Sequence, residues 1–190
     1  FVERAYAQTL RLSALIKDIA LITKLEEASN LFPREKVNIG RIAEDVINEL
    51  QTQLDKAGMK VENRLGADLE ISGNYNLVHA IFRNLVENSI NYAGKNSSIV
   101  VECSKEDTEF YHFKYYDTGY GIKEKYLQKI FDRFVRLEES RDRRTGGTGL
   151  GLSVVKHAVL FHQGNIIAVN RPEGGLMFKF CLKKHSAVRI

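Results

Sequence analysis

Hydrophobic and polar positions along the chain follow two periods, one typical of helices and one typical of strands. The helical period predicts long helices over residues 1–29, 39–57, 74–93 and 150–163, and a short one over residues 123–131. Two-residue alternation predicts a strand over residues 176–182. Other strands are predicted near residues 60–63, 69–72, 98–105, 109–117 and 165–169, with β-favouring residues in the 98–105 and 109–117 segments. This order predicts a two-layer α/β (α+β) sandwich, in which helices cover one face of a mixed, largely antiparallel sheet.

The first predicted helix stands apart from this sandwich. It contains no Gly or Pro, and the segment Asn30-Leu-Phe-Pro33 ends it. Because Leu10 and Leu21 lie off its apolar stripe, we expect it to pack on more than one partner, and a bundle or coiled coil with absent helices would suit it. The stripe consists of Leu12, Leu15, Ile16, Ile19 and Ile22.

Composition narrows the class of protein. The chain has 190 residues, 44% hydrophobic and 27% charged, which predicts one compact domain with an appendage. A net charge of +4 without a basic run argues against nucleic-acid binding. Cys103 and Cys181 are expected to be buried, reduced thiols of a cytosolic domain. No apolar run approaches the ~18 residues of a membrane span, and the start at Phe1, in mid-helix, suggests a fragment.

Three asparagines share one face of the 74–93 helix. Asn84, Asn88 and Asn91 are spaced i, i+4 and i+7, beside an apolar arc. Amides at the margin of a core are costly without partners, and Asn is a mediocre helix former. One interpretation of the three asparagines is that they form a solvated polar edge of the helix. The other is that they line a polar cavity, in which a neutral amide oxygen binds Mg²⁺ that is shared with phosphates.

The segment Tyr116-Asp-Thr-Gly-Tyr-Gly-Ile122 places a carboxylate, Asp117, at the end of a strand and follows it with Gly119 and Gly121. A tight turn is the simpler interpretation. The functional one is a pocket floor, where the glycines admit a flat ligand and the carboxylate selects an N–H donor such as the adenine amine.

A glycine-rich run precedes the 150–163 helix. Four of the six residues from Gly146 to Gly151 are glycine, although each costs roughly 0.5–1 kcal/mol relative to alanine. One interpretation is a flexible surface loop, and the other is a set of bare N–H groups that face an anion at a helix N-terminus. The run matches neither GxxxxGK[ST] nor GxGxxG, so a nucleotide site of another design is required.

Four motifs together carry a family resemblance. IFRNLVENSINYA, DTGYGI, IFDRFVR and TGGTGLGL occur in this order and resemble the N, G1, F and G2 boxes of sensor histidine kinases. These belong to the GHKL superfamily, with gyrase, mismatch-repair and heat-shock chaperone ATPases. The resemblance implies a catalytic ATP-binding domain over residues 31–190. It also implies that residues 1–30, with RLSALIKDIALITKLEE, form the second helix of a dimerisation and phosphoacceptor hairpin.

The resemblance implies a role for each motif residue. Asn88 would bind Mg²⁺ and Asn84 would lie beside it, near the phosphates. Asp117 would accept a hydrogen bond from the adenine amine, and Arg136 would reach the terminal phosphate. The other implied ATP-binding residues are Asn91, Tyr92, Gly119, Gly121, Ile122, Gly147, Thr148, Gly149, Leu150, Gly151 and Leu152.

The resemblance also implies a lid over residues 132–148, anchored by Phe131 and Phe134. We interpret the lid arginines as solvated charges; they are Arg141, Arg143 and Arg144.

Three departures from the family pattern stand out. Asn91 occupies a position where the family usually carries Lys or Arg, so weaker ATP binding is expected unless Arg136 or a lid arginine substitutes. Gln163 replaces a glycine after His162. No histidine has the phosphoacceptor context, so the chain is expected to hold the phosphate donor machinery without its acceptor. The five histidines are His79, His112, His157, His162 and His185.

The sequence thus predicts the ATP-binding part of a protein-histidine kinase, which transfers the γ-phosphoryl of Mg·ATP to a histidine on a missing hairpin helix. ATP and Mg²⁺, that hairpin and a response regulator are the implied cofactors and partners. The implied setting is a cytoplasmic domain of a homodimer, with inner-membrane anchoring as an option. Two alternatives stay open: a GHKL ATPase or serine kinase outside two-component signalling, and a non-catalytic interaction module, which Asn91 favours.

Overall fold

A computed structural model describes residues 2–137 and 147–185. Its α-helices are α1 (Val2–Glu27), α2 (Ile39–Ala57), α3 (Tyr75–Tyr92) and α4 (Gly151–Phe161). Short 3₁₀ helices follow at η1 (Ser29–Leu31), η2 (Glu124–Tyr126) and η3 (Lys129–Phe131). The strands are β1 (Glu35–Asn38), β2 (Lys60–Arg64), β3 (Glu70–Gly73), β4 (Ser98–Glu106), β5 (Phe110–Asp117), β6 (Ile166–Asn170) and β7 (Leu176–Lys183).

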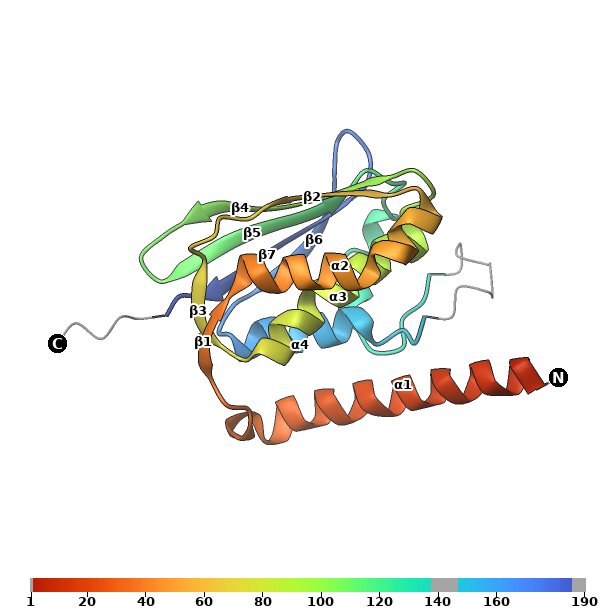
Figure 1. The fold of residues 1–190 in the computed structure, drawn as a ribbon, viewed down its shortest axis with the longest axis horizontal. Helices are drawn as coiled ribbons and strands as arrows, with labels where there is room; N and C mark the ends of the chain where they lie inside the picture. The colour runs from red at the N-terminus through yellow and green to blue at the C-terminus, as the bar shows by residue number, and fades with distance from the viewer. Residues whose placement is uncertain (1, 138–146, 186–190) are drawn as a thin grey trace.

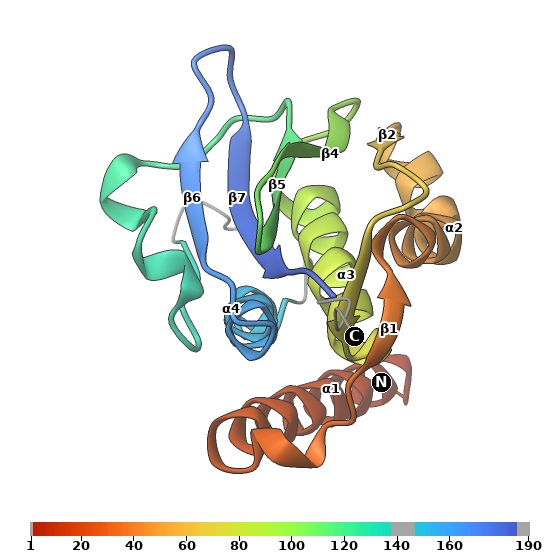
Figure 2. The same cartoon turned by 90° about the vertical axis from the view of Figure 1, so that its left-hand side faces the viewer.

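The main sheet has the strand order β2-β4-β5-β7-β6. Only the β2–β4 pair within it is parallel, and the other pairs are antiparallel. Helices α2, α3 and α4 cover one face of this sheet, as the end-on view shows (Figure 2). The predicted fold class is therefore confirmed: a mixed, largely antiparallel sheet with helices on one face, preceded by one long helix.

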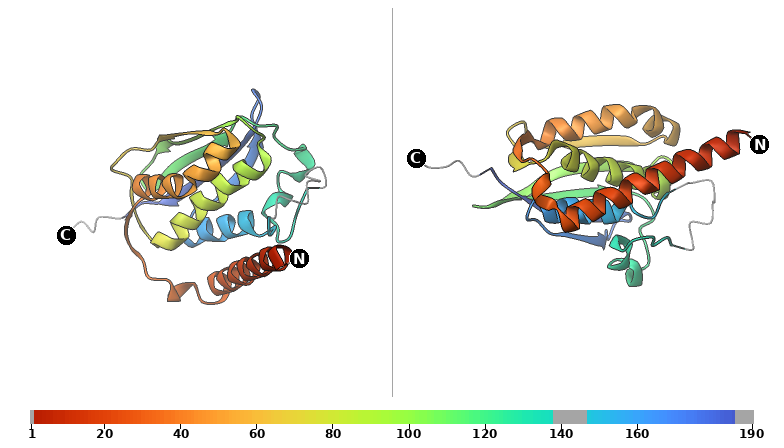
Figure 3. Two further views of the ribbon diagram at one scale, coloured as in Figure 1. Left: turned by 45° about the vertical axis from the view of Figure 1, so that its right-hand side comes forward. Right: turned by 90° about the horizontal axis from the view of Figure 1, so that it is seen from below.

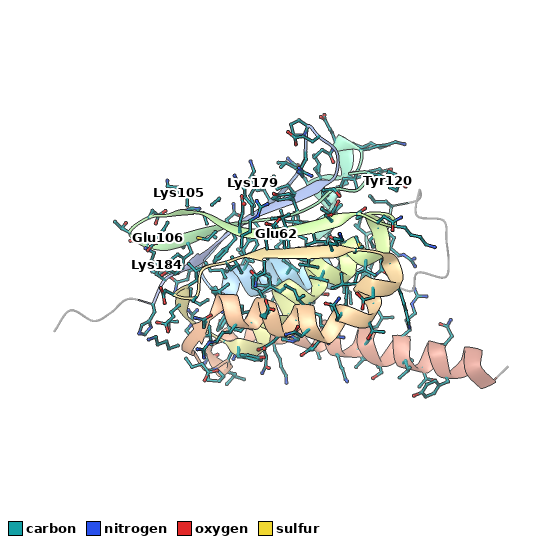
Figure 4. All side chains as sticks on the ribbon, turned by 45° about the horizontal axis from the view of Figure 1, so that its top comes forward. Glu62, Lys105, Glu106, Tyr120, Lys179 and Lys184 are labelled. Atoms are coloured by element: carbon teal, nitrogen blue, oxygen red, sulfur yellow. The ribbon has the colours of Figure 1, made fainter. Side chains whose placement is uncertain are left out.

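Alternation along β7 shows how the sheet divides core from solvent. Phe178 and Phe180 are buried between the sheet and the helices, whereas Lys179 is exposed on the opposite face. Phe180 meets Phe82 of α3 edge-on, with ring centroids 6.3 Å apart. Charged side chains such as Lys179 and Glu62 line the strands on the side away from the helices (Figure 4).

Helix α1 lies outside the sandwich and passes beneath α4 (Figures 1 and 3). Ile22, which is 1% exposed, packs there against Leu150 and Val154, and burial of one such side chain is worth about 1.5–3 kcal/mol. Glu26 adds contacts with Arg133 and with Nε2 of His157, the latter at 2.9 Å.

The predicted stripe of α1 divides between two faces. Ile22 and Leu15 turn toward the domain, whereas other members remain exposed on the far side; these are Leu12, Ile16 and Ile19. No helix among the described residues is long and apolar enough to span a membrane.

Two local predictions were wrong, and one strand was missed. Cys103 and Cys181 are half-buried, although they were expected to be buried. The segment 123–131 forms two 3₁₀ helices, η2 and η3, in place of one α-helix. Strand β1 was not predicted, because only Val37 in its four residues is buried and its partner β3 is 35 positions further along. Their antiparallel pair forms a small second sheet beside the start of α2.

Candidate functional site

A cavity of about 1060 Å³ lies between α3, the loop after β5, residues 130–137, the glycine-rich loop before α4, and α1. The predicted site residues that line it are Asn84, Asn88, Asn91, Tyr92, Asp117, Gly121, Ile122, Arg136, Gly147, Thr148, Gly149, Gly151 and Leu152. Gly119 and Leu150 are the predicted site residues that do not line it.

The asparagine stripe of α3 faces this cavity. Nδ2 of Asn84 donates to the carbonyl of Ala80 at 2.8 Å, which leaves its Oδ1 as the free end of the amide. The half-buried Asn88 makes no side-chain hydrogen bond within residues 2–137 and 147–185. Asn91 is exposed at the rim. Two amides of the stripe, those of Asn84 and Asn88, therefore present polar atoms to the cavity.

Asp117 ends β5 at the inner wall of the cavity and is 3% exposed. Its Oδ1 accepts from the N–H groups of Gly119 at 2.9 Å and Leu176 at 3.2 Å. Burial raises the pKa of this carboxyl above its ordinary value, and these backbone hydrogen bonds oppose the rise. Gly119 itself packs on the backbone of Ala93 at the end of α3, which fixes where the carboxylate lies.

The glycine-rich loop forms the opposite wall. Gly149 has φ of 75°, a left-handed conformation that favours glycine, and its carbonyl accepts from Phe134 N–H at 2.9 Å. Oγ1 of Thr148 accepts from Leu150 N–H at 3.1 Å. Because α4 begins at Gly151, the N–H groups of its first turn have no partners within the helix and favour an anion there.

Several expectations for this region need correction. The side chain of Leu150 is fully buried against α1, so only its backbone can serve the site. Phe131 is buried as expected, but Phe134 is 60% exposed and contributes its backbone N–H in place of an anchoring ring. Most of the predicted lid, with Arg141, Arg143 and Arg144, lies outside the described residues.

Helix α1 supplies cavity residues that no motif predicted, among them Lys17 and Asp18. The hydroxyl of Thr148 donates to Oδ2 of Asp18 at 3.3 Å, and Nη2 of Arg11 donates to the carbonyl of Gly147 at 3.4 Å. Burial raises the pKa of Asp18, the Thr148 hydroxyl lowers it, and the negative charge of Glu87 raises it further. Only the docking of α1 on the domain brings these residues to the site.

The sequence reasoning also missed residues within the helices and strands of the site. Glu87 lines the cavity and pairs with Nε of Arg83 at 3.0 Å. Ser89 is fully buried and donates to Oδ2 of Asp117 at 3.3 Å. A signal was present for Ser89, because it lies at helical spacing from Phe82 and Leu85, on the apolar arc, where a hydroxyl requires a partner.

The chemistry of this donor set suits Mg²⁺ held jointly with a ligand. Among the described residues, no group of three or more His, Cys, Asp or Glu side chains could hold a metal ion. Asn88 offers a neutral amide oxygen, which is a ligand that Mg²⁺ accepts alongside phosphate oxygens.

The chain is similar to known proteins in sequence and in fold. The family described as histidine kinase-, DNA gyrase B-, and HSP90-like ATPase matches residues 73–186. The sensor-like histidine kinase SenX3 of Mycobacterium bovis is 28% identical over 96% of this chain, which spans only 44% of that relative.

Two solved structures share the fold. ShkA in complex with AMPPNP has a TM-score of 0.77 at 20% identity, over 100% of this chain and 41% of that one. The histidine kinase ThkA in complex with the response regulator TrrA has a TM-score of 0.72 at 21% identity, over 97% of this chain and 50% of that one.

Proposed function

The chain belongs to the histidine kinase-, DNA gyrase B- and HSP90-like ATPase family, and from this premise we propose that its cavity binds Mg·ATP for phosphoryl transfer to a histidine. One observation carries the proposal. The asparagine stripe of α3, the buried carboxylate of Asp117 and the N-terminus of α4 with its glycine-rich loop face one cavity. An amide ligand, a base acceptor and an anion site are the three elements that a purine triphosphate needs.

The roles follow from the chemistry of each wall. Asp117 accepts from the amine of adenine, with Tyr92 and Ile122 beside the base. Asn88 holds Mg²⁺, which neutralises phosphate charge, and Asn84 lies beside the phosphates. Backbone N–H groups near Gly149 and Gly151 face the phosphates. Gly119 sets the position of Asp117, and the backbone of Leu150 belongs to the same loop.

At the phosphate end the protein supplies positioning and charge neutralisation, which account for most of the catalysis of phosphoryl transfer. Arg136 lines the cavity and is the candidate for contact with the terminal phosphate. Asn91 brings no charge, so a cation of the described lining has to offset its loss. Arg136 and Lys17 of α1 are the candidates, because Arg83, which also lines the cavity, is paired with Glu87 and Glu49.

We assign residues 1–30 to the second helix of a dimerisation and phosphoacceptor hairpin, and residues 31–190 to the catalytic domain. The exposed stripe of α1 with Leu12, Ile16 and Ile19 is apolar enough to pack in a helical bundle. A partner hairpin that carries the histidine, a homodimer of the full-length protein and a response regulator are the proposed partners. A cytoplasmic domain, attached to the inner membrane through other parts of the protein, is the proposed setting.

Transfer in trans tests this function. The chain is incubated with γ-labelled Mg·ATP and a separate histidine-bearing hairpin from the same protein, and phosphate on each is measured after acid and after alkali. We expect acid-labile, alkali-stable label on the hairpin, none on the chain, and loss of labelling with Asn88→Ala. Label on the chain itself, or ATP binding without transfer to the hairpin, would contradict the proposal, and the second result would favour a non-catalytic module.

A further inference from the structure

The two oxygens of Asp117 have different partners. Oδ1 is held by two backbone N–H groups, from Gly119 and Leu176. Oδ2 accepts from Oγ of Ser89 at 3.3 Å, and Ser89 in turn accepts from the hydroxyl of Tyr115 at 3.1 Å. A chain of hydrogen bonds therefore runs from β5 to α3 and back to the end of β5, and of its three side chains only Asp117 lines the cavity.

The donor and acceptor capacities of the three side chains determine the direction of both hydrogen bonds. An ionised carboxylate only accepts, so Ser89 donates its single hydrogen to Asp117. Ser89 must then accept from Tyr115, which is a donor only while its phenol is protonated. Burial raises the pKa of Tyr115 well above its ordinary value, so the phenol stays protonated. With the carboxylate ionised, no other arrangement of the hydrogens makes both contacts.

Burial of the two hydroxyl groups in this series of hydrogen bonds carries a free-energy cost. Ser89 is 0% exposed and Tyr115 is 1% exposed, both among apolar side chains of the main core. A hydroxyl in such a place destabilises the fold unless it is paired. The two hydroxyls satisfy each other only in part, because the serine hydrogen still needs an acceptor, and Asp117 provides it. The hydroxyls and the carboxylate are thus one unit.

We propose that Ser89 and Tyr115 are positioning residues for base selection: they orient Oδ2 of Asp117 so that the cavity prefers a purine with an exocyclic amine. Within the described residues Oδ2 receives only the Ser89 hydroxyl, which leaves it able to accept one more hydrogen bond, from a ligand. Backbone amides fix the other oxygen, so the carboxylate cannot rotate without breaking three bonds. This inference rests on the proposed function and deepens it.

The test compares two ligands. The chain is titrated calorimetrically with the Mg²⁺ complexes of ATP and of purine riboside triphosphate, which lacks the 6-amino group. Variants are Ser89→Ala, Tyr115→Phe and the double variant. Ser97→Ala is the matched control, because Ser97 is also a buried serine near the end of α3 but donates to the carbonyls of Ala93 and Gly94.

We expect Ser89→Ala to weaken ATP binding about tenfold, the size of a lost hydrogen bond to a charged group, and to change binding of the analogue less than about twofold. Tyr115→Phe should weaken ATP binding less, and the double variant no more than Ser89→Ala. Ser97→Ala should change neither ligand.

The pH profile of ATP binding is the second readout. Among the described residues, the charged and titratable groups that act on this carboxyl are Arg171, whose Nη1 donates to the backbone carbonyl of Asp117 at 3.1 Å, and Tyr115. Loss of the Ser89 hydroxyl raises the pKa of Asp117 further, so the pH below which ATP binding is lost should move upward in Ser89→Ala and stay unchanged in Ser97→Ala.

The outcomes separate the two proposals. If Ser89→Ala weakened the binding of both ligands equally, or left the affinity for ATP unchanged, the positioning role would be overturned, while the proposal that the cavity binds ATP would stand. Absence of binding by the unaltered chain would overturn the proposed function, and the inference with it.

Discussion

A β-carbon on Gly151 would lie 2.6 Å from Oδ1 of Asn84. The first residue of α4 therefore touches the asparagine stripe of α3 so closely that no side chain fits between them. Nδ2 of Asn84 is bonded to Ala80 at 2.8 Å, so the amide cannot turn away without losing that bond. The glycine-rich loop and the stripe, far apart in sequence, form one wall of the candidate site.

Substitution of Gly151 by Ala should therefore damage the site more than the fold. Alanine has a helix propensity that is more favourable than that of glycine by up to about 1 kcal/mol, and this gain offsets part of the cost of the clash. Displacement of Asn84, however, should weaken ATP binding about tenfold or more. Thermal unfolding and ATP titration measure the two effects. Gly66→Ala is the control, since nothing lies within 4 Å of its added β-carbon; equal effects of the two substitutions would contradict this account.

Asp18→Asn should strengthen ATP binding. The carboxylate of Asp18 lies in the cavity beside Thr148, where it repels phosphate charge, and an amide oxygen can still accept from the Thr148 hydroxyl. We expect a gain of about threefold that shrinks as salt is added. Asp55→Asn, at an exposed carboxylate of α2, should change nothing. Weaker binding after Asp18→Asn would show that the helix contact, and not the charge, matters to the site.

His162 should make the fold sensitive to acid. Burial lowers its pKa from 6.5 to about 4, the hydrogen bond of its Nδ1 to the Ala158 carbonyl opposes this shift, and the positive charge of Arg34 adds to it. In the folded protein its Nε2 accepts from Asn74 N–H. Between these values the unfolded chain binds a proton that the folded chain does not, so stability falls as pH decreases from 6.5 toward 4, by about 3 kcal/mol. Urea unfolding across this window should show a shallower pH dependence for His162→Gln. The same slope in both proteins would contradict the assignment.

Gln163→Gly should stabilise the fold. Gln163 has φ of 58°, in the left-handed region that disfavours side chains. Glycine removes that strain but adds freedom to the unfolded chain, so the net gain in unfolding free energy should be about 0.5–1 kcal/mol. Asn96→Gly, at φ of 59°, should gain less, because Asn tolerates this conformation. Chemical denaturation measures both. A loss of stability in Gln163→Gly would mean that the hydrogen bond from Nζ of Lys183 to Oε1 of Gln163, at 2.9 Å, outweighs the strain.

Local patterns predicted the fold class and brought most of the candidate site together. The spacing of Asn84 and Asn88 on one helix face, and Asp117 at the end of a strand, are set by periods of a few residues. Such periods survive in any tertiary arrangement, which is why the sequence reveals them.

The rest depends on contacts between distant segments. Ile22 packs on Val154 although 132 positions separate them, and nothing in either segment alone indicates that α1 would place Asp18 in the cavity. Strand β1 exists through its pairing with β3. The position of Ser89 on the apolar arc indicates only that its hydroxyl needs a partner. Its role was missed because that partner, Asp117, lies 28 positions away and is brought close by the fold.

Titration of Mg·ATP into the unaltered chain and into Asp117→Asn tests the central claim most directly. Burial raises the pKa of Asp117, so its charge destabilises the folded protein above pH 3.8, the ordinary value, and the amide should keep or increase stability at neutral pH. The amide nitrogen, however, replaces the acceptor that faces the base. We predict saturable binding by the unaltered chain and its loss in a fully folded Asp117→Asn. Unchanged ATP affinity in the variant would contradict the assignment of this cavity as an adenine site.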